Sequence, residues 1–310
     1  IISPARAKKR VAVIGAGPAG LACASTLAER GHEVHLYDSA SEIGGQFNLA
    51  KRIPGKEEFS ETLRYFSRRL QTTGVHLHLN ERVTASALAQ GFDDIVLATG
   101  VAPRNPKIPG QDAARPGQVL SYIDVLLQRQ PVGRRVAIVG AGGIGFDVAE
   151  FLLESHSQTL RPDVWRRTWG VGDPAQSRGG WLAPQPQQPE REVVLLQRKA
   201  GKMGAGLGTT TGWIHRAALK MNQVEMLTGV NYEAITPQGL TISYGADRKD
   251  VQCVTADTIV LCAGQEPLRE LQAPLQALGR SVHLIGGADQ AGELDAKRAI
   301  RHGTELAARL

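Results

Sequence analysis

The chain of 310 residues is long enough for about two domains, each with its own core. Its 42% hydrophobic, 21% charged and 5% aromatic residues are typical of a globular protein and exclude a disordered chain. The formal net charge of +6 permits nucleic-acid binding, but the basic residues are spread along the chain, so we expect no nucleic-acid partner.

The sequence contains neither a membrane segment nor a clustered cysteine motif. No apolar run approaches the roughly 20 residues that cross a bilayer, and no signal-peptide pattern opens the chain. We therefore expect no membrane association and a cytoplasmic location. Cys23, Cys253 and Cys262 are isolated from one another, which predicts neither a C-x-x-C redox pair nor a metal site. Because the chain begins with Ile1, we expect it to be part of a longer protein.

The first motif is an apolar strand that runs into a glycine-rich turn. Gly15, Gly17 and Gly20 follow the strand with G-x-G-x-x-G spacing and precede a helix-like segment. The first glycine permits the tight turn, the second lets the backbone approach a pyrophosphate, and the third lets the helix pack closely. The next expected strand ends before Asp38, where an acidic side chain binds the hydroxyls of an adenosine ribose. We interpret this pattern as a dinucleotide site, with a structural glycine turn as the alternative.

Two further segments complete this first nucleotide-binding pattern. Residues 41–46 read SEIGGQ, a second glycine turn that can hold another side of the nucleotide. Residues 57–73 carry apolar positions at helical spacing, which predicts a helix with one buried face. Residues 93–100 read DDIVLATG, which indicates a short strand ending at a turn of small residues.

Both the opening motif and the later strand recur in the same order. Residues 136–145 read VAIVGAGGIG, with Gly140, Gly142 and Gly145 at the earlier spacing, and residues 257–264 read DTIVLCAG. A chance echo of one motif is plausible, but two in the same order indicate an internal repeat. The sequence therefore predicts an α/β protein with two Rossmann-like dinucleotide-binding domains.

The second repeat carries an insertion at about residues 156–191. It is rich in Pro, Gly, Gln and Arg, and it contains Trp165, Trp169 and Trp181. Long loops without regular structure are usually functional or disordered, and clustered tryptophans argue against disorder. We expect a loop that caps the nucleotide or contacts another domain, with a decorative insertion as the alternative.

The end of the VVLL strand distinguishes the second repeat from the first. It reads Gln197, Arg198 and Lys199 where the first repeat has Asp38. A carboxylate accepts the ribose hydroxyls but repels a 2′-phosphate, whereas basic side chains attract that phosphate. The second repeat therefore favours NADPH over NADH, unless the two cations are merely solvated. The glycine-rich residues 201–212 either approach a ligand or form a mobile loop.

The motifs resemble those of the two-dinucleotide-domain flavoprotein reductases: GAGPAG with a following acid, ATG, a second G-x-G-x-x-G, and GGAD before a terminal helix. The resemblance implies an NADPH domain inserted into an FAD domain. We expect the FAD domain at residues 1–112 and 265–310, and the NADPH domain at residues 113–264.

Motifs and resemblance together nominate binding residues for both cofactors. Asp38 is expected to take the adenosine ribose, and Asp289 the ribityl and pyrophosphate region of FAD. No catalytic side chain is nominated, because hydride transfer between nicotinamide and flavin requires none. The residues expected to bind FAD are Gly15, Gly17, Pro18, Ala19, Gly20, Asp38, Gly45, Gln46, Arg52, Val83, Thr99, Gly100 and Asp289. Those expected to bind NADPH are Gly140, Gly142, Gly143, Ile144, Gly145, Arg198 and Lys199.

A closer resemblance rests on the strings EIGGQFNLAKRIPGKEEF, QRK and TTGWIHR. They are similar to the C-terminal half of the bacterial NADPH-dependent 2,4-dienoyl-CoA reductases, in the trimethylamine dehydrogenase-like family. The resemblance implies a partner: a preceding barrel of the same parent chain, absent here, with FMN and a 4Fe-4S cluster. There the electrons would reduce 2,4-dienoyl-CoA in unsaturated fatty acid β-oxidation. The alternatives are a freestanding NADPH-dependent reductase that feeds a separate iron-sulfur protein, and a nucleotide-sensing module without turnover.

Overall fold

The computed structural model describes residues 2–154, 156–292 and 295–310, and the chain forms two compact units. The units divide after residues 102 and 264, and the boundaries expected from the sequence lie after residues 112 and 264. Most of the second unit is thus inserted into the sequence of the first. The first unit comprises Ile1–Lys51, Glu58–Ala102 and Gln265–Leu310, and the second comprises Arg52–Glu57 and Pro103–Gly264.

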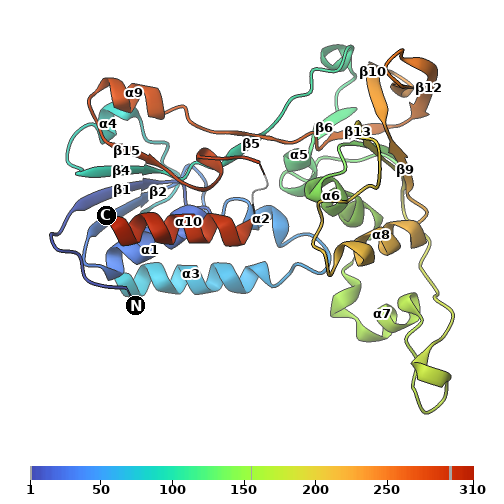
Figure 1. The fold of residues 1–310 in the computed structure, drawn as a ribbon, viewed down its shortest axis with the longest axis horizontal. Coiled ribbons are helices and arrows are strands. Elements are labelled where there is room, and N and C mark those ends of the chain that lie inside the picture. The colour runs from blue at the N-terminus through green and yellow to red at the C-terminus, as the bar shows by residue number, and fades with distance from the viewer. Residues whose placement is uncertain (1, 155, 293–294) are drawn as a thin grey trace. The chain divides into compact units, whose positions relative to one another are not determined.

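The first unit is built on a parallel five-stranded sheet in the order β15-β4-β1-β2-β3 (Figure 1). All neighbouring strands run parallel, and β1 and β4 are buried along most or all of their length. Such burial on both faces explains why these strands are continuous apolar runs. The strands are β1 (Arg10–Ile14), β2 (Glu33–Tyr37), β3 (His76–His78), β4 (Asp94–Leu97) and β15 (Val282–Leu284).

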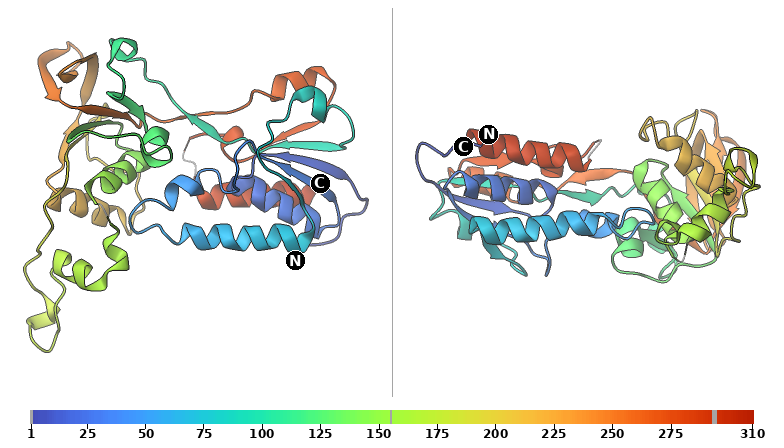
Figure 2. Two further views of the ribbon diagram at one scale, coloured as in Figure 1. Left: turned by 180° about the vertical axis from the view of Figure 1, so that it is seen from behind. Right: turned by 90° about the horizontal axis from the view of Figure 1, so that it is seen from below.

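Helices cover both faces of this sheet. Figures 1 and 2 show α1, α3 and α10 on one face, with α4 and α9 on the other. Val13, Leu27 and Leu70 belong to the buried cluster on the first face, and Leu97 and Leu275 to the cluster on the second. The helices are α1 (Pro18–Glu29), α2 (Phe47–Ala50), α3 (Phe59–Thr73), α4 (Ala85–Leu88), α9 (Gln272–Ala277) and α10 (Ala296–Arg309).

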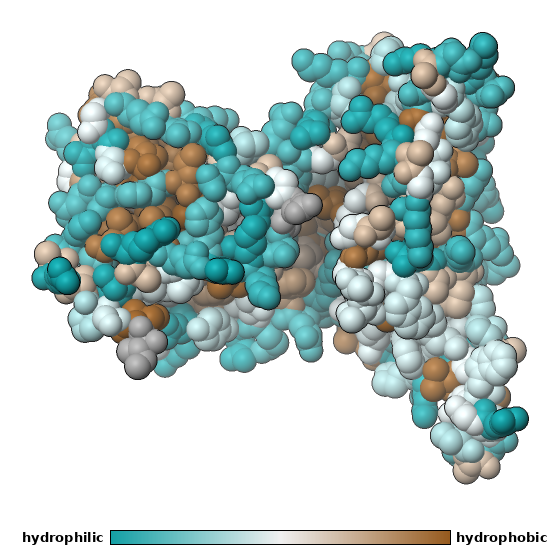
Figure 3. All heavy atoms as spheres, in the orientation of Figure 1, coloured by the Kyte–Doolittle hydropathy of each residue, from teal (hydrophilic) through white to brown (hydrophobic). Residues whose placement is uncertain are grey.

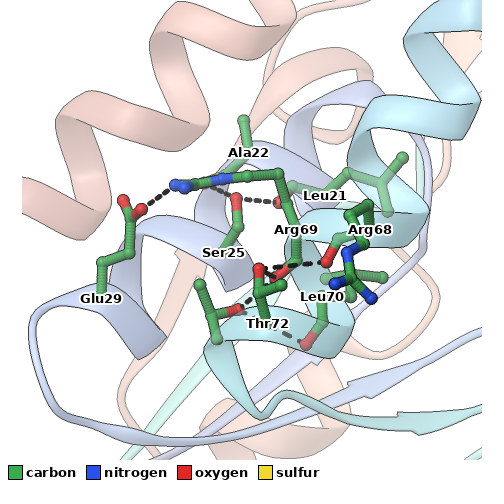
Figure 4. A network of polar contacts seen from close by, with 9 residues as sticks. Leu21, Ala22, Ser25, Glu29, Arg68, Arg69, Leu70 and Thr72 are labelled. Carbon is green, nitrogen blue, oxygen red and sulfur yellow. Dashed lines mark hydrogen bonds and ion pairs between the residues drawn. The ribbon is translucent and has the colours of Figure 1, made fainter.

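A polar network links the C-terminal turns of α1 and α3 (Figure 4). Arg69 of α3 forms an ion pair with Glu29 of α1. The Ser25 hydroxyl donates to the Leu21 carbonyl at 2.8 Å, and the Thr72 hydroxyl donates to the Arg68 carbonyl at 3.0 Å. These hydroxyls are therefore satisfied within their own helices, while the ion pair orients α3 against α1.

The second unit repeats the parallel sheet, in the order β6-β13-β7-β8-β9, with α5, α6 and α8 on one side (Figure 1). This repetition confirms the predicted Rossmann-like α/β class. The strands are β6 (Val119–Ser121), β7 (Arg135–Val139), β8 (Glu192–Gln197), β9 (Glu225–Thr228) and β13 (Thr258–Leu261), and the helices are α5 (Tyr122–Leu126), α6 (Gly143–Leu153) and α8 (Gly212–Met221).

An antiparallel sheet that the sequence did not predict packs against this parallel sheet. It has the order β10-β11-β12, and Val230, Leu240 and Ile242 share a buried cluster with Val139 and Ile259 of the parallel sheet. A further pair, β5 with β14, forms where the chain passes between the two units. These strands are β5 (Val101–Pro103), β10 (Val230–Thr236), β11 (Gly239–Tyr244), β12 (Lys249–Thr255) and β14 (Gln265–Pro267).

The insertion contains a helix, contrary to the expectation of a loop without regular structure. The helix α7 (Pro162–Trp169) begins with proline and ends at Gly170, whose φ of 69° is left-handed. Both are ordinary boundary signals for a helix. Short 3₁₀ turns η2 (Gln158–Leu160) and η3 (Arg178–Gly180) flank it. Apolar side chains remain exposed here, including Leu160 and Leu182, and apolar atoms are visible on this segment in Figure 3.

None of the helices in the described ranges combines the length and the apolar character that crossing a bilayer requires.

Candidate nucleotide-binding sites

The turn between β1 and α1 is shaped by its glycines. Gly15 has a φ of 108°, and its N–H donates to the Tyr37 carbonyl at 2.7 Å. A Cβ at Gly15 would overlap the Ala98 carbonyl oxygen, and a Cβ at Gly20 would overlap the Gly15 carbonyl oxygen. Glycine is therefore required for the turn to fit between its strand and its helix. Pro18 begins α1, where its missing N–H costs nothing.

Asp38 lies beside this turn and is hydrogen-bonded to it. Its Oδ2 accepts the Ala16 N–H at 2.7 Å, and its Oδ1 accepts the Ala40 N–H at 2.8 Å. A carboxylate has about four acceptor positions, so each oxygen retains capacity for a further donor. Asp38 can thus hold the turn and accept a hydroxyl of a ligand at the same time.

A pocket of about 250 Å³ lies at this edge of the first unit. Arg82 and Glu270 form an ion pair of 2.7 Å on its lining, and the Thr99 hydroxyl donates to the Leu268 carbonyl at 2.6 Å. No sequence motif points to Arg82, Leu268 or Glu270, because their positions at the pocket depend on distant segments. The residues of the predicted FAD set that line this pocket are Gly15, Asp38, Val83 and Thr99.

The second glycine turn packs against the first. The Gly44 N–H donates to the Ala16 carbonyl at 2.8 Å, and a Cβ at Gly45 would lie 3.0 Å from the Cα of Gly17. Gln46 follows at the start of α2, and within the described ranges its side chain makes no hydrogen bond or ion pair. The structure therefore brings Gly45 and Gln46 to the glycine-rich turn.

The terminal GGAD motif packs against the start of α1, the helix that follows the first glycine-rich turn. A Cβ at Gly286 would lie 2.8 Å from the Cβ of Ala19, which places the motif against the first turn of α1. The Gly286 N–H donates to His302 Nδ1 at 3.2 Å, and Asp289 is half-exposed, with Oδ2 4.0 Å from the same nitrogen. Gly100 contributes a left-handed turn, and its carbonyl accepts the Leu268 N–H at 3.0 Å.

Arg52 is the one residue of the expected FAD set that belongs to the second unit. Its Nη1 donates to the carbonyls of Leu126 and Leu127 at 2.6 and 3.0 Å. These carbonyls lie at the C-terminal end of α5, where the helix leaves acceptors unpaired and favours a cation. The contacts in the structure therefore give Arg52 a helix-capping role.

The second glycine-rich turn has the geometry of the first. Gly140 has a φ of 111°, and its N–H donates to the Leu196 carbonyl at 2.9 Å. A Cβ at Gly140 would overlap the Cys262 carbonyl oxygen, and one at Gly145 would overlap the Gly140 carbonyl oxygen. At the start of α6, Gly142 and Gly143 are exposed and Ile144 is half-buried. This exposed helix start is suited to binding phosphate.

Two cations lie at the end of β8 without an acidic partner. Arg198 and Lys199 are exposed, and their side chains form no ion pair or hydrogen bond with any described residue. Two residues before Arg198, the Leu196 carbonyl accepts the Tyr232 hydroxyl at 3.2 Å. Burial raises the pKa of Tyr232 to about 12. The arrangement leaves both charges available to an anionic ligand.

A charged cluster on α6 was not predicted from the sequence. Lys56 pairs with Asp147 at 2.5 Å, and His215 Nδ1 lies 2.6 Å from Glu150 Oε1. The hydrogen bond to Glu150 raises the pKa of His215. At Glu154, the residue that follows α6, burial raises the pKa to about 7. These contacts attach residues 52–57 and α8 to α6.

The three cysteines are not joined by a disulfide bond. Cys23 and Cys262 are buried and Cys253 is exposed, and all three are free. Burial raises the pKa of Cys23 to about 12 and also raises that of Cys262. Among the residues that the structure describes, no group of three or more His, Cys, Asp or Glu side chains is arranged to hold a metal ion.

Comparison with known proteins identifies relatives of the whole chain. A family model described as pyridine nucleotide-disulphide oxidoreductase matches residues 9–283. A metal reductase of Desulforamulus reducens is 30% identical over 302 residues, which cover 93% of this chain and 42% of that protein. The chain spans 42%, 41% and 40% of the lengths of three such relatives, which are therefore more than twice as long.

Solved structures with the same fold include chains more than twice as long as this one and chains of about the same length. A 2-naphthoyl-CoA reductase has a TM-score of 0.80 and 26% identity, over 100% of this chain and 41% of that chain. A thioredoxin reductase of Lactococcus lactis has a TM-score of 0.66 and 18% identity, over 97% of each chain. At that identity, the second likeness shows the fold alone.

Proposed function

Because the chain belongs to the pyridine nucleotide-disulphide oxidoreductase family, we propose that it is a reductase module that passes a hydride from NADPH to FAD. The family implies FAD and a pyridine nucleotide as cofactors. The choice of NADPH rests on one observation: Arg198 and Lys199 are exposed at the end of β8, where a 2′-phosphate is recognised, and no described residue pairs with them.

We assign FAD to the first unit. Asp38 keeps acceptor capacity for the ribose, and the start of α1 offers N–H groups to the pyrophosphate. Gly45 packs against Gly17 of this turn, and Gly286, three residues before Asp289, packs against Ala19 at the start of α1. Bound FAD would supply the hydride acceptor, so the residues of this unit bind and orient and need not act as acids or bases.

We assign NADPH to the second unit. The exposed start of α6 faces its pyrophosphate, and the two cations neutralise its 2′-phosphate. The phosphate contacts fix the nucleotide, which lowers the entropy cost of bringing the nicotinamide to a productive position.

We further propose that the electrons pass to other groups of a longer parent protein. Two observations support this: the chain spans 42% of a metal reductase and 41% of a 2-naphthoyl-CoA reductase, and its three cysteines are free and isolated. The resemblance of the strings EIGGQF, QRK and TTGWIHR favours an N-terminal FMN and 4Fe-4S barrel that reduces 2,4-dienoyl-CoA. A cytoplasmic location fits this role and is part of the proposal.

A freestanding reductase is the second candidate. The fold occurs in a chain of similar length, the thioredoxin reductase of Lactococcus lactis, so this arrangement of two units does not require a preceding barrel. A freestanding reductase would feed a separate iron-sulfur protein. Immunodetection of the parent protein in cell extract discriminates the two, because a band at the size of this chain alone favours the freestanding form.

An anaerobic titration tests the central proposal. The purified chain is reconstituted with FAD and mixed with NADPH or NADH, and the flavin absorbance is followed. Fast bleaching by NADPH and slow bleaching by NADH is the expected result, and it also excludes a nucleotide sensor without turnover. Equal bleaching by both coenzymes would contradict the coenzyme assignment, and a protein that binds no FAD would overturn the whole proposal.

A further inference from the structure

The two repeats can be superposed residue by residue at the ends of their second strands. In the first unit, Tyr37 pairs with Ile14 and accepts the N–H of Gly15. In the second unit, Leu196 pairs with Val139 and accepts the N–H of Gly140. Tyr37 and Leu196 are therefore equivalent positions, and the residues that follow them, Asp38 and Gln197, are equivalent as well.

These two equivalent side chains make opposite hydrogen bonds. Asp38 accepts, from the Ala16 N–H in the glycine-rich turn and from the Ala40 N–H. Gln197 donates: its Nε2 lies 3.0 Å from the Lys199 carbonyl oxygen and 3.2 Å from that of Gly201. Gln197 thus bonds to the segment after its own strand, residues 198–201, instead of to the glycine-rich turn.

Those hydrogen bonds fix the segment that carries the cations. The Lys199 carbonyl also accepts the Gly229 N–H at 3.2 Å, so it is held from two sides. Gly201 has a φ of 100°, which lets the chain turn its carbonyl back towards Gln197. These hydrogen bonds hold the backbone carbonyls of Lys199 and Gly201. The side chains of Arg198 and Lys199 remain exposed.

We propose that Gln197 is a positioning residue for selection of the 2′-phosphate. Its neutral amide removes the carboxylate that would repel the phosphate, and its two donated hydrogen bonds hold residues 198–201 so that both cations face the ligand. The inference rests on the proposed use of NADPH by the second unit. The selectivity for NADPH over NADH then depends on the neutral Gln197 amide as well as on Arg198 and Lys199.

Two substitutions separate the effects of charge and of hydrogen bonding. Gln197→Glu has nearly the same shape, but a carboxylate cannot donate and adds a negative charge. Gln197→Met is neutral and of similar length, and it cannot donate either. Binding is measured by calorimetry on the FAD-loaded chain, with 2′,5′-ADP and 5′-AMP as probes, because these ligands differ only in the 2′-phosphate.

We expect Gln197→Glu to weaken 2′,5′-ADP binding by about tenfold or more, and to change 5′-AMP binding by less than about threefold. Gln197→Met should weaken 2′,5′-ADP binding by about threefold to tenfold, through loss of the two hydrogen bonds. The matched control is Gln252→Glu on β12, where the side chain donates to the Tyr244 hydroxyl. It should leave the ratio of the two affinities unchanged.

The outcomes distinguish this inference from the proposed function. If the unaltered chain does not prefer 2′,5′-ADP over 5′-AMP, the NADPH assignment itself fails. If it does prefer 2′,5′-ADP, and both Gln197 variants keep that preference while melting at the same temperature, the role of Gln197 is contradicted alone. A loss of both affinities together would show a general structural role and would also contradict selection of the 2′-phosphate.

Discussion

Reversing the charge of one residue is expected to change the coenzyme preference. Arg198 is exposed and makes no ion pair with any described residue, so reversing its charge breaks no internal contact. Arg198→Glu should raise the KM for NADPH by about tenfold to a hundredfold and leave that for NADH within about threefold, because only NADPH carries the 2′-phosphate. Steady-state kinetics with both coenzymes measure this, and Lys220→Glu, an exposed charge reversal on α8, is the control. Equal changes in both KM values would contradict the assignment.

Glu154 should make the protein less stable as the pH rises towards neutrality. Burial raises its pKa to about 7, so the folded protein binds this proton more tightly than the unfolded chain. Its contribution to the free energy of unfolding is therefore lost as the pH rises from the ordinary glutamate range through about 7. Because the side chain is only half-buried, we expect a loss of about 1 kcal/mol.

Glu154→Gln removes this titration while keeping the shape of the side chain. The variant should melt about 2–4 °C above the unaltered protein at pH 8, and at the same temperature at pH 4. Thermal unfolding at the two pH values measures the difference. The exposed Glu225→Gln provides the control. An identical pH profile for the Glu154→Gln variant and the unaltered chain would show that Glu154 is not held protonated.

Each strand–turn–helix element uses its last glycine for the same steric purpose. A Cβ at Gly20 or at Gly145 would overlap the carbonyl oxygen of the first glycine of its own motif, Gly15 or Gly140. Gly20→Ala should therefore lower FAD retention and spare 2′,5′-ADP binding, whereas Gly145→Ala should do the reverse. Flavin absorbance after gel filtration and calorimetry measure the two effects. Each variant is the control for the other, and loss of both ligands in either variant would contradict separate sites.

These elements could be predicted because their requirements are local. The clash that demands glycine at position 20 arises within six residues of the chain, so spacing alone reveals it. By contrast, Arg52 caps carbonyls of Leu126 and Leu127, and no local pattern connects such distant positions. The helix α7 was missed although Pro162 and Gly170 are boundary signals, because the surrounding composition is that of a loop. The hydrogen bonds of Gln197 could not be predicted, since its acceptors are backbone carbonyls, which no side-chain pattern reveals.

At the scale of the whole molecule, three buried clusters of described residues each belong to a single unit. Those around Val13 and Leu97 consist of residues of the first unit, and the one around Val139 consists of residues of the second. Ligands that bind only one folded unit stabilise that unit by mass action. Calorimetric unfolding should therefore show two transitions, one raised by FAD and the other by 2′,5′-ADP. A single transition raised by either ligand would contradict independent units.

The segment of residues 52–57 has a consequence for recombination between relatives. It is encoded far from the rest of the second unit, yet Arg52 caps α5, Lys56 pairs with Asp147, and the Gly55 N–H donates to the Ser157 hydroxyl at 3.2 Å. A chimaera with crossovers only after residues 102 and 264 would keep this segment from one parent and its contacts from the other. A chimaera that exchanges the second unit must therefore exchange residues 52–57 as well as residues 103–264. Residues 52–57 and their contacts on α5 and α6 should then come from the same parent.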